Sequence, residues 1–310
     1  MLVVRIQGGL GNQIFQYLFA LKLKQRFPET EVAIDLNSYR RYHPHNGYEL
    51  DKWFQLSPDV REIRDRDFRR ITGTLPYVGP LGDTAGLPWL VRKGLGLINR
   101  CIEKVNTAKK DRSHIIAQKY TDGYPELDLD TLDPSRDLYF DGTWFNESAD
   151  TVAIYASGFS IVPVEDTAVK ALLSGMDPQR SVSVHVRHGD YSAWGYELLS
   201  DDYYKNAIEY MKSQVNDPFF YFFSDDPAYV KENLLPLCGD RGIMVEGNEG
   251  PRSFLDLYLI SRCKNHVVAN SSFSYSARVL SGSDGHLVAP KKWINGNRTW
   301  DIPGCVYLDP

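Results

Sequence analysis

The second half of the chain alternates short apolar runs with longer amphipathic segments, and this alternation restricts the possible folds more than any other feature. It predicts strands at 181–187, 219–224, 242–246, 265–269 and 286–289 and helices at 202–215, 227–236, 252–262 and 272–281. Strands that follow one another through helices pair in parallel, which predicts a doubly wound, Rossmann-like sheet. The carboxyl ends of such strands share one edge, where open α/β sheets bind their ligands.

The start of the chain predicts another strand, a glycine-rich turn and a buried helix. A strand at 3–6 precedes Gly9, Gly11 and Asn12, and an apolar segment covers 14–27. Glycines let the backbone pass close to a ligand, and the helix start behind them favours an anion. A tight turn alone would also require the glycines. The spacing fits neither the dinucleotide-binding nor the P-loop motif, and Asn12 is expected near the N-cap position.

Charged side chains gather where two of the predicted strands end, namely His185, Arg187, Asp190, Asp225 and Asp226. An arginine at a strand end can neutralise a diphosphate without a metal ion, because its fork of donors matches phosphate oxygens. Alternatively, His185, Arg187 and Asp190 form a structural ion pair beside a buried histidine. The adjacent aspartates suit ribose or guanine, or a metal ion. Because Asp226 precedes a proline as a helix cap does, a metal is disfavoured.

A run of hydroxyl side chains precedes the last predicted helix. The segment 270–276 contains four serines, among them Ser271, Ser272 and Ser274. Serine hydroxyls and backbone N–H groups at a helix N-terminus form a phosphate seat, whereas capping alone needs one serine.

A polar loop in the first half contains His43, His45 and Asn46. These side chains could line a sugar pocket or belong to a solvated loop. Trp144 suits the core and the lining of a cleft equally well.

The segment 61–112 is basic within an acidic chain, with twelve Lys or Arg residues against six Asp or Glu residues. Because it also contains a tryptophan in 87–93, it could contact an anionic membrane surface. The alternative is a solvated helical excursion.

Composition excludes several classes of function. A net charge of −5 gives no reason to expect nucleic acid as a partner. The chain has no apolar run of 18 residues, and its start lacks the pattern of a signal peptide, so a cytoplasmic protein is expected. The four cysteines are far apart in the sequence, which favours buried free thiols over zinc sites or disulfides.

Four motifs together resemble the bacterial α-1,2-fucosyltransferase family, glycosyltransferase family 11. They follow the family's order over nearly the whole chain: Gln7-Gly-Gly-Leu-Gly-Asn-Gln-Ile-Phe-Gln-Tyr17, His185-Val-Arg-His-Gly-Asp-Tyr191, Phe223-Ser-Asp-Asp226 and Asn270-Ser-Ser-Phe-Ser274. The stretches Asn46-Gly-Tyr-Glu-Leu50 and Phe140-Asp-Gly-Thr-Trp144 are also similar to that family.

The resemblance implies a GT-B architecture, in which two Rossmann-like domains face each other across a cleft. GDP-β-L-fucose would bind the C-terminal domain, and a galactose-containing acceptor would lie nearer the N-terminal one. Transfer to O2 of the acceptor would invert the fucose anomeric carbon without a metal or another cofactor. The expected domains are 1–163, including the basic stretch 61–112, and 164–310.

Carried onto this sequence, the resemblance places Arg187 on the diphosphate and Asn12 beside the β-phosphate and the fucose. Asp190 is expected to orient Arg187, and the general base is not identified. The donor-binding residues it implies are His185, Asp225, Asp226, Ser271, Ser272, Phe273, Ser274, Gly9 and Gly11. The candidates on the acceptor side are His43, His45, Asn46 and Trp144.

Two alternatives remain for the function. The first keeps the fold and uses a different GDP-linked deoxysugar as donor. The second is a non-catalytic protein that binds a sugar nucleotide or a glycan, although such a protein needs no group that stabilises a leaving diphosphate. The expected enzyme is cytoplasmic, with the option of peripheral contact with the inner membrane.

Overall fold

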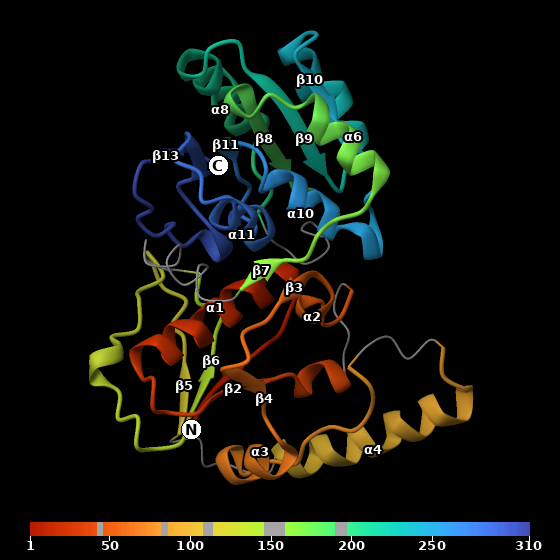
Figure 1. Ribbon diagram of the computed structural model, residues 1–310, viewed down its shortest axis with the longest axis vertical. Coiled ribbons are helices and arrows are strands. Elements are labelled where there is room, and N and C mark those ends of the chain that lie inside the picture. Colours follow the sequence, from red (N-terminus) through yellow and green to blue (C-terminus); the bar gives the residue numbers. More distant parts are fainter. Residues whose placement is uncertain (42–45, 82–85, 108–113, 146–158, 190–196) are drawn as a thin grey trace. The chain divides into compact units, whose positions relative to one another are not determined.

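A computed structural model describes residues 1–41, 46–81, 86–107, 114–145, 159–189 and 197–310. The chain divides into two compact units: unit 1 comprises Met1–Lys119 and Glu126–Val162, and unit 2 comprises Tyr120–Pro125 and Pro163–Pro310. Each unit is built on a parallel sheet (Figure 1). The predicted α/β fold with two Rossmann-like units, as in GT-B enzymes, is therefore confirmed. The sequence did not predict that 120–125 belongs to unit 2, where the Gly123 N–H donates to the Arg298 carbonyl.

The sheet of unit 1 has five strands in the order β4-β2-β1-β6-β5, all parallel. The strands are β1 (Leu2–Arg5), β2 (Val32–Asp35), β4 (Val60–Glu62), β5 (Ile115–Ala117) and β6 (Leu138–Asp141). A separate antiparallel pair joins β3 (Phe54–Gln55) to β7 (Ser160–Ile161). The strand order reverses between β1 and β6, so the polar residues that end these two strands lie at a topological switch point.

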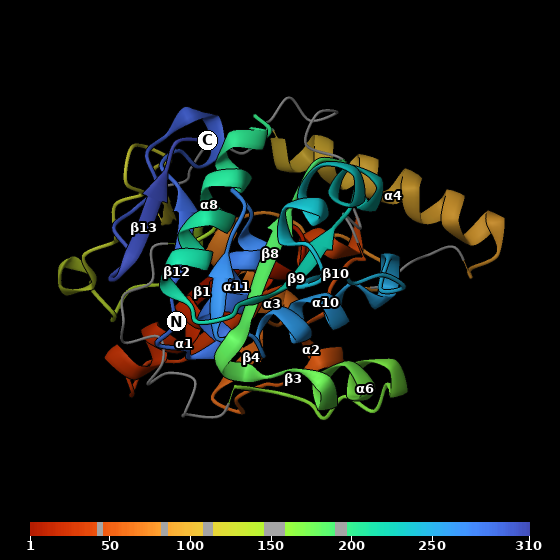
Figure 2. The ribbon, with the colours of Figure 1, turned by 90° about the horizontal axis from the view of Figure 1, so that it is seen from above.

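The helices of unit 1 differ greatly in burial. They are α1 (Leu10–Arg26), α2 (Leu50–Trp53), α3 (Asp65–Thr72) and α4 (Trp89–Thr107), with the 3-10 helices η1 (Asn37–Arg40) and η2 (Leu129–Thr131). Helix α1 is buried along most of its length and packs on β1 and β2. By contrast, α4 runs along the periphery of the unit and extends beyond the sheet in both ribbon views (Figures 1 and 2).

The sheet of unit 2 has the order β10-β9-β8-β11-β12-β13, with every neighbouring pair parallel. Its strands are β8 (Ser181–Val186), β9 (Phe219–Ser224), β10 (Gly242–Met244), β11 (Asn265–Val267), β12 (Leu287–Pro290) and β13 (Cys305–Leu308). In chain order this is the 3-2-1-4-5-6 arrangement of doubly wound sheets, which bind ligands where the order reverses. That point lies between β8 and β11. The alternation predicted all of these strands except β13.

The helices of unit 2 are α6 (Thr167–Gly175), α8 (Asp201–Gln214), α9 (Pro227–Tyr229), α10 (Phe254–Ile260) and α11 (Ser272–Ser281). Short 3-10 helices are η3 (Pro178–Arg180), η5 (Leu235–Cys238), η6 (Gly250–Arg252) and η7 (Ile294–Gly296), and η4 (Val230–Leu234) is a π-helix. The segment 227–236 is helical as predicted, but it divides into three kinds of helix where a single one was expected. Pro236 has no N–H and its ring crowds the preceding turn, so a regular α-helix cannot continue.

The central strand of unit 2 is buried on both faces. Side chains alternate along a strand, so Val182, Val184 and Val186 all point into one core, which α8 covers. The opposite face receives Ser183 and His185, and α10 and α11 lie side by side there (Figure 2). The Ser183 hydroxyl is 2.9 Å from Nδ1 of His266. This alternation sends His185 toward α11.

Candidate functional site

The residues that end β8 and β9 form an ordered pair of charges. Arg187 directly follows β8, and its Nη1 lies 2.9 Å from Oδ2 of Asp225, which directly follows β9. The other oxygen of Asp225 accepts a hydrogen bond from the His188 backbone N–H at 2.8 Å. The hydrogen bond from His188 thus holds Asp225 in place, and Asp225 in turn orients the Arg187 guanidinium. Arg187 stands at the switch point of the sheet, where a ligand is expected.

A glycine lets the two strand ends approach this closely. A Cβ atom on Gly189 would meet Oδ2 of Asp225 at 3.0 Å and its Cγ at 3.2 Å. Any larger residue would press on the carboxylate that holds Arg187.

His185 is a buried, neutral member of the same site. Its side chain is 5% exposed, and its ring centroid lies 5.7 Å from that of Phe273 in the first turn of α11. Burial lowers the pKa of His185 to about 4, and the nearby Arg187 charge adds to this effect. Its Nδ1 is buried and has no hydrogen-bond partner among the described residues. A polar atom in that condition accommodates a ligand group readily.

The serine-rich start of α11 uses its hydroxyls unequally. Ser271 is the N-cap, and its hydroxyl accepts from the Phe273 N–H at 3.3 Å. Ser274 is fully buried and its hydroxyl donates to the Ser271 carbonyl at 3.3 Å. Ser276 similarly donates to the Phe273 carbonyl. Ser272, the first residue of the helix, is only half-buried, so it is the hydroxyl of this group best placed to meet a ligand.

Asp226 serves as a helix cap, as its position before a proline predicted. Its carboxylate accepts from the Tyr229 N–H at 3.1 Å at the start of α9. Its other oxygen is 3.7 Å from Nδ1 of His188, whose ring stands 4.1 Å from that of Tyr229. Asp226 therefore borders the Arg187 site while part of its hydrogen-bonding capacity serves the backbone.

The glycine-rich turn of unit 1 begins α1 earlier than expected. The helix starts at Leu10 with Gly9 as N-cap, and Asn12, which was expected near the N-cap, lies in the first turn as the third helical residue. The cause is backbone geometry, because Gly9 is extended at φ −76° and ψ 174° and already precedes a helical turn. Gly8 has φ +82°, and a Cβ there would lie 2.5 Å from Nδ2 of Asn12. Because Gly8 has no side chain, the Asn12 amide can lie close to its backbone.

The acceptor candidates do not form one group in the described structure. Trp144 is 5% exposed and stacks on Phe19 at 4.2 Å between ring centroids, so it is a core residue. Nδ2 of Asn46 donates to the Glu49 side chain at 3.3 Å. His43 and His45 lie outside the described residues.

Asp190 likewise lies outside the described residues. The orienting role predicted for it is filled, within the described chain, by Asp225. This pairing was missed because sequence alone does not show which carboxylate on a neighbouring strand reaches Arg187.

A second polar cluster, also missed, lies at the carboxyl edge of the unit 1 sheet. Nη1 of Arg5, the last residue of β1, donates to Asp141 at the end of β6 over 3.1 Å. Asp35 ends β2, is almost fully buried and accepts from the Tyr139 hydroxyl at 2.5 Å. Desolvation by burial raises the pKa of Asp35. Nε2 of Gln7 also donates to Asp141, at 3.2 Å. The sequence did contain a signal, since Arg5, Asp35 and Asp141 each follow a short apolar run.

Two glutamines of the first motif prove to be structural. Gln13 is fully buried and ties three backbone groups together, donating to the carbonyls of Gly8 and Gly47 and accepting from the Glu49 N–H. Gln16 accepts from the Gln7 N–H at 2.8 Å and donates to the Gly142 carbonyl at 3.0 Å. They hold the loops around the glycine-rich turn in fixed positions.

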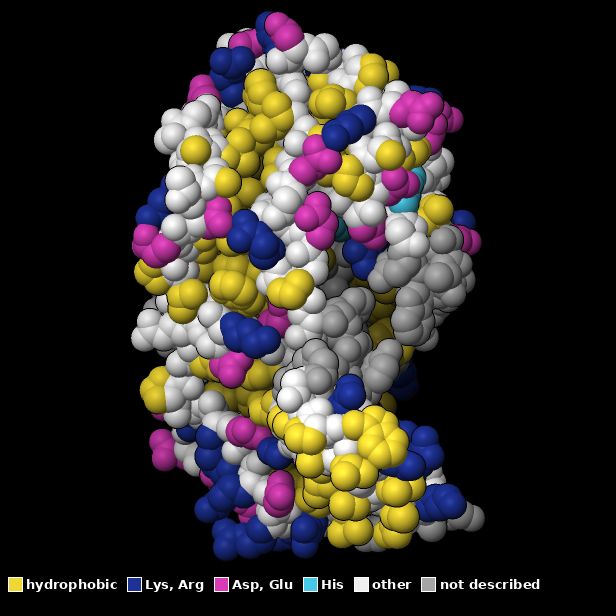
Figure 3. All heavy atoms as spheres, turned by 90° about the vertical axis from the view of Figure 1, so that its right-hand side faces the viewer, with side chains coloured by type: hydrophobic (Ala, Val, Ile, Leu, Met, Phe, Trp, Pro, Cys, Tyr) yellow, Lys and Arg dark blue, Asp and Glu magenta, His cyan; other side chains and the backbone are white. Residues whose placement is uncertain are grey.

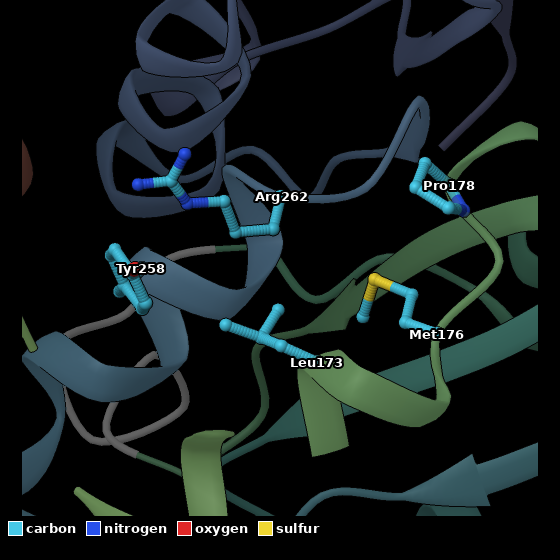
Figure 4. A pocket seen from close by; sticks show the side chains of 5 residues that line it. All are labelled: Leu173, Met176, Pro178, Tyr258 and Arg262. Atoms are coloured by element: carbon cyan, nitrogen blue, oxygen red, sulfur yellow. The ribbon is translucent and has the colours of Figure 1, made fainter. Parts of the chain in front are cut away.

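Other candidate sites carry no comparable chemistry. Within the described residues no cluster of His, Cys, Asp and Glu is arranged to hold a metal ion. The four cysteines are unpaired, although Cys101 is exposed where a buried thiol was expected. An open pocket of about 380 Å³ in unit 2 is lined by Leu173, Met176, Pro178, Tyr258 and Arg262 (Figure 4). These residues precede β8 and β11, so the pocket lies at the amino ends of the strands, away from Arg187.

Comparison with known proteins gives the chain its family. The sequence model described as glycosyl transferase family 11 matches residues 137–302, more than half of the chain. The alpha-1,2-colitosyltransferase of Escherichia coli is 27% identical over 318 residues, covering 98% of this chain and 96% of that protein. The O-antigen biosynthesis glycosyltransferase WbnK of Escherichia coli is 25% identical over 305 residues, covering 94% of each. The fucosyltransferase NodZ from Bradyrhizobium has a TM-score of 0.49 at 17% identity, covering 90% of this chain and 92% of that chain. The chain belongs to glycosyl transferase family 11.

Proposed function

We propose that this chain transfers L-fucose from GDP-β-L-fucose to O2 of a galactose-type residue on a surface glycan or its lipid-linked precursor. The product would be an α-1,2 linkage, formed with inversion at the fucose anomeric carbon. Two relatives that span nearly the whole chain support this proposal. One is named for α-1,2 transfer of colitose and the other for O-antigen biosynthesis.

The observation that carries the donor site is the orientation of Arg187. Asp225 holds its guanidinium at 2.9 Å, and the His188 N–H fixes Asp225 in turn. A guanidinium has five N–H donors, so it can hold a carboxylate and a diphosphate together. The contact of His185 with Phe273 brings the start of α11 to the same place. An arginine and a helix N-terminus at one point suit a diphosphate.

The chemistry that this arrangement supports is stabilisation of a leaving group. As the bond between the sugar and GDP breaks, negative charge grows on the diphosphate and positive charge grows on the sugar. Donors fixed before the reaction, here Arg187 and the first turn of α11, stabilise that charge without rearrangement. Ser272 is the polar side chain that we assign to the diphosphate, and the family resemblance alone assigns Asn12 to the β-phosphate and the fucose.

A metal ion is not part of the proposal, because the two carboxylates that the structure describes near Arg187 already have other roles. Asp225 holds Arg187 and the His188 N–H, and Asp226 caps α9. A metal ion would have to displace the guanidinium from Asp225. We propose that the arginine supplies the positive charge that a divalent cation supplies in other sugar-nucleotide enzymes.

A second donor is favoured by one specific observation. The relative that covers 98% of this chain is named a colitosyltransferase, and colitose is L-fucose without its 3-hydroxyl group. A GDP-linked deoxysugar of that kind would use the same diphosphate site. The two donors differ only where the sugar binds, so a direct competition between them is informative.

Calorimetry with GDP, UDP, ADP and NAD tests the donor site. We expect a GDP-selective response that persists in EDTA, since the diphosphate contacts are made by protein groups. Turnover of GDP-fucose and GDP-colitose with galactosides, with the anomer and linkage of each product determined by NMR, tests the reaction. A preference for UDP or a strict requirement for Mn²⁺ would overturn the donor assignment. GDP binding without turnover of either donor on any galactoside would favour the non-catalytic alternative.

A further inference from the structure

Helix α4 is attached to unit 1 through polar contacts on its inner face. The Asn99 side chain accepts from the Val78 N–H and donates to the Val78 carbonyl, both at 2.9 Å. One heptad later, Asn106 makes the same pair of bonds to Leu75, at 2.8 and 2.9 Å. Each asparagine side chain thus makes the two backbone hydrogen bonds that a neighbouring β-strand would otherwise make to that residue. The inner face of this helix is consequently its amide-bearing face.

The outer face of α4 is apolar and exposed, the reverse of the usual arrangement of a surface helix. Leu90 is 73% exposed, Leu97 54% and Ile98 50%, and Val105 continues the same stripe. Their spacing of seven, one and seven residues keeps them on one side of the helix. Trp89, at the first position, is 60% exposed. Figure 3 shows an apolar patch bordered by Lys and Arg side chains in the lower part of the molecule, where α4 lies in Figure 1.

A row of basic residues runs along one flank of this stripe. Lys93, Arg100 and Lys104 are all exposed and follow at intervals of seven and four residues. Nζ of Lys93 lies 4.8 Å from the centre of the Trp89 ring. Glu103, the sole acidic residue between 89 and 107, belongs to the inner side, where it pairs with Arg41. The outer face therefore combines apolar side chains with positive charge only.

We propose that the outer face of α4 docks onto the anionic surface of a lipid bilayer. An apolar stripe flanked by lysine and arginine, with a tryptophan at one end, is the pattern of a helix that lies in the plane of a membrane interface. The apolar side chains enter the boundary between head groups and acyl chains, and the basic row meets anionic head groups. The helix does not span the bilayer, because no helix in the described chain is long and apolar enough to do so.

Charge selects a bilayer over a second copy of this chain as the occupant. Pairing two α4 helices through their apolar stripes would bring two basic rows together without an acidic partner on either outer face. An anionic leaflet satisfies the apolar stripe and the basic row together. This inference concerns unit 1 alone and does not depend on the donor, the linkage or the acceptor of the proposed reaction.

Vesicle flotation with the full-length protein tests the inference. We expect binding to vesicles of equal parts phosphatidylglycerol and phosphatidylcholine, and much weaker binding to phosphatidylcholine alone. Each Lys or Arg near an anionic surface contributes roughly a fivefold factor in partitioning, so Arg100→Glu with Lys104→Glu should weaken binding at least tenfold. Leu90→Glu with Leu97→Glu should abolish it. Raising NaCl from about 0.05 M to about 0.5 M should weaken binding by the wild type.

The matched control is Leu237→Glu, an exposed apolar position in unit 2, which should bind vesicles as the wild type does. All variants should keep the wild-type melting temperature, because the replaced side chains are exposed. A blue shift of tryptophan emission on binding, lost in Trp89→Phe, would place α4 itself at the lipid. Failure of the wild type to bind, equal loss in the Leu237→Glu control, or a dimer that Leu97→Glu dissociates would each overturn the proposal.

Discussion

The carboxyl edges of the two parallel sheets are built alike. In unit 1, Arg5 at the end of β1 binds Asp141 at the end of β6 over 3.1 Å. In unit 2, Arg187 at the end of β8 binds Asp225 at the end of β9 over 2.9 Å. Arg5 is the last residue of β1 and Arg187 directly follows β8, and these are the first strands of their sheets in chain order. The glycine-rich start of α1 comes next in the chain after Arg5, whereas the serine-rich start of α11 reaches the end of β8 through the contact of Phe273 with His185. An arginine paired with an aspartate at the ends of two neighbouring strands therefore occurs in each unit.

The two edges differ in their balance of charge. Arg5 stands near two carboxylates, Asp141 and the buried Asp35. Arg187 pairs with Asp225, and the neighbouring Asp226 is used as a helix cap. A diphosphate would meet less repulsion in unit 2, whereas the hydroxyl groups of a neutral sugar suit the carboxylates of unit 1. This difference is the reason for proposing that the nucleotide binds at the edge of unit 2, although both edges contain an arginine.

Replacing each arginine by alanine should separate the two edges most strongly. We expect Arg187→Ala to weaken GDP binding by about 100-fold, since a charge-assisted bond contributes up to about 3 kcal/mol. Turnover should fall by about 10³-fold, because the contact is strongest when the diphosphate leaves. Arg5→Ala should leave GDP affinity within about twofold of the wild type. Calorimetry and initial rates measure both.

Thermal unfolding supplies the control, because Arg187→Ala should melt close to the wild type. Arg187→Lys should recover only part of the affinity, since an ammonium group lacks the planar fork. If Arg5→Ala weakened GDP binding as much as Arg187→Ala, the assignment of the nucleotide to unit 2 would be wrong.

The sequence predicted the central strands of the unit 2 sheet because they are largely buried on both faces and therefore consist of short apolar runs. The predicted strand at 219–224 agrees with β9 at both ends. Strand β13 was missed because only the short 3-10 helix η7 separates it from β12, so the strand–helix alternation on which the prediction rested ends before it.

The candidate site was predicted in its residue types but not in its pairings. Arg187 was chosen from its position after a strand, which local sequence reveals. Its partner Asp225 is distant in sequence and becomes its neighbour only through the register of β8 against β9, in which Val186 faces Ser224. The role of Gly8 in accommodating Asn12 was hidden for the same reason, since it depends on a backbone angle.

Buried Asp35 in unit 1 and buried His185 in unit 2 should make the free energy of unfolding depend on pH in opposite directions. The pKa of His185 is lowered to about 4 by burial and by Arg187, so the unfolded chain binds its proton first as pH falls. The stability it contributes is complete above about pH 6.5 and is lost toward pH 4. His185→Gln should remove this loss, which amounts to about 3 kcal/mol. Chemical denaturation across this pH range measures it.

Asp35 should show the opposite sign, because burial raises its pKa. Its contribution to stability is complete below its ordinary pKa and is lost as pH rises through the higher, folded-state pKa. Asp35→Asn should therefore gain stability relative to the wild type as pH increases from acid. The free energy of unfolding of each variant is compared with that of the wild type across pH. If the two differences changed with pH in the same direction, one of these groups would not titrate as its burial requires.

The smallest effects concern Gly8 and Gly189, which make room for the side chains of Asn12 and Asp225. Gly8 has φ +82°, and a Cβ there meets the Asn12 amide at 2.5 Å. Gly8→Ala should therefore destabilise unit 1 by roughly 1–3 kcal/mol through backbone strain alone. A Cβ on Gly189 meets the Asp225 carboxylate at 3.0 Å without a positive φ. Gly189→Ala should change the free energy of unfolding by less than about 0.5 kcal/mol.

The loss of GDP affinity should be larger for Gly189→Ala than for Gly8→Ala, the reverse of the order expected for stability. Displacement of Asp225 in Gly189→Ala loosens the hold on Arg187, and we expect GDP affinity to fall about threefold, or roughly 0.6 kcal/mol. Gly8→Ala should lower the affinity for GDP less than Gly189→Ala does and lower turnover more, because the side chain it displaces, Asn12, is assigned to the fucose as well as to the β-phosphate. Thermal melts and GDP titrations on both variants form a complete set of four measurements. A Gly189→Ala protein that binds GDP as the wild type does would mean that Arg187 keeps its orientation without Asp225.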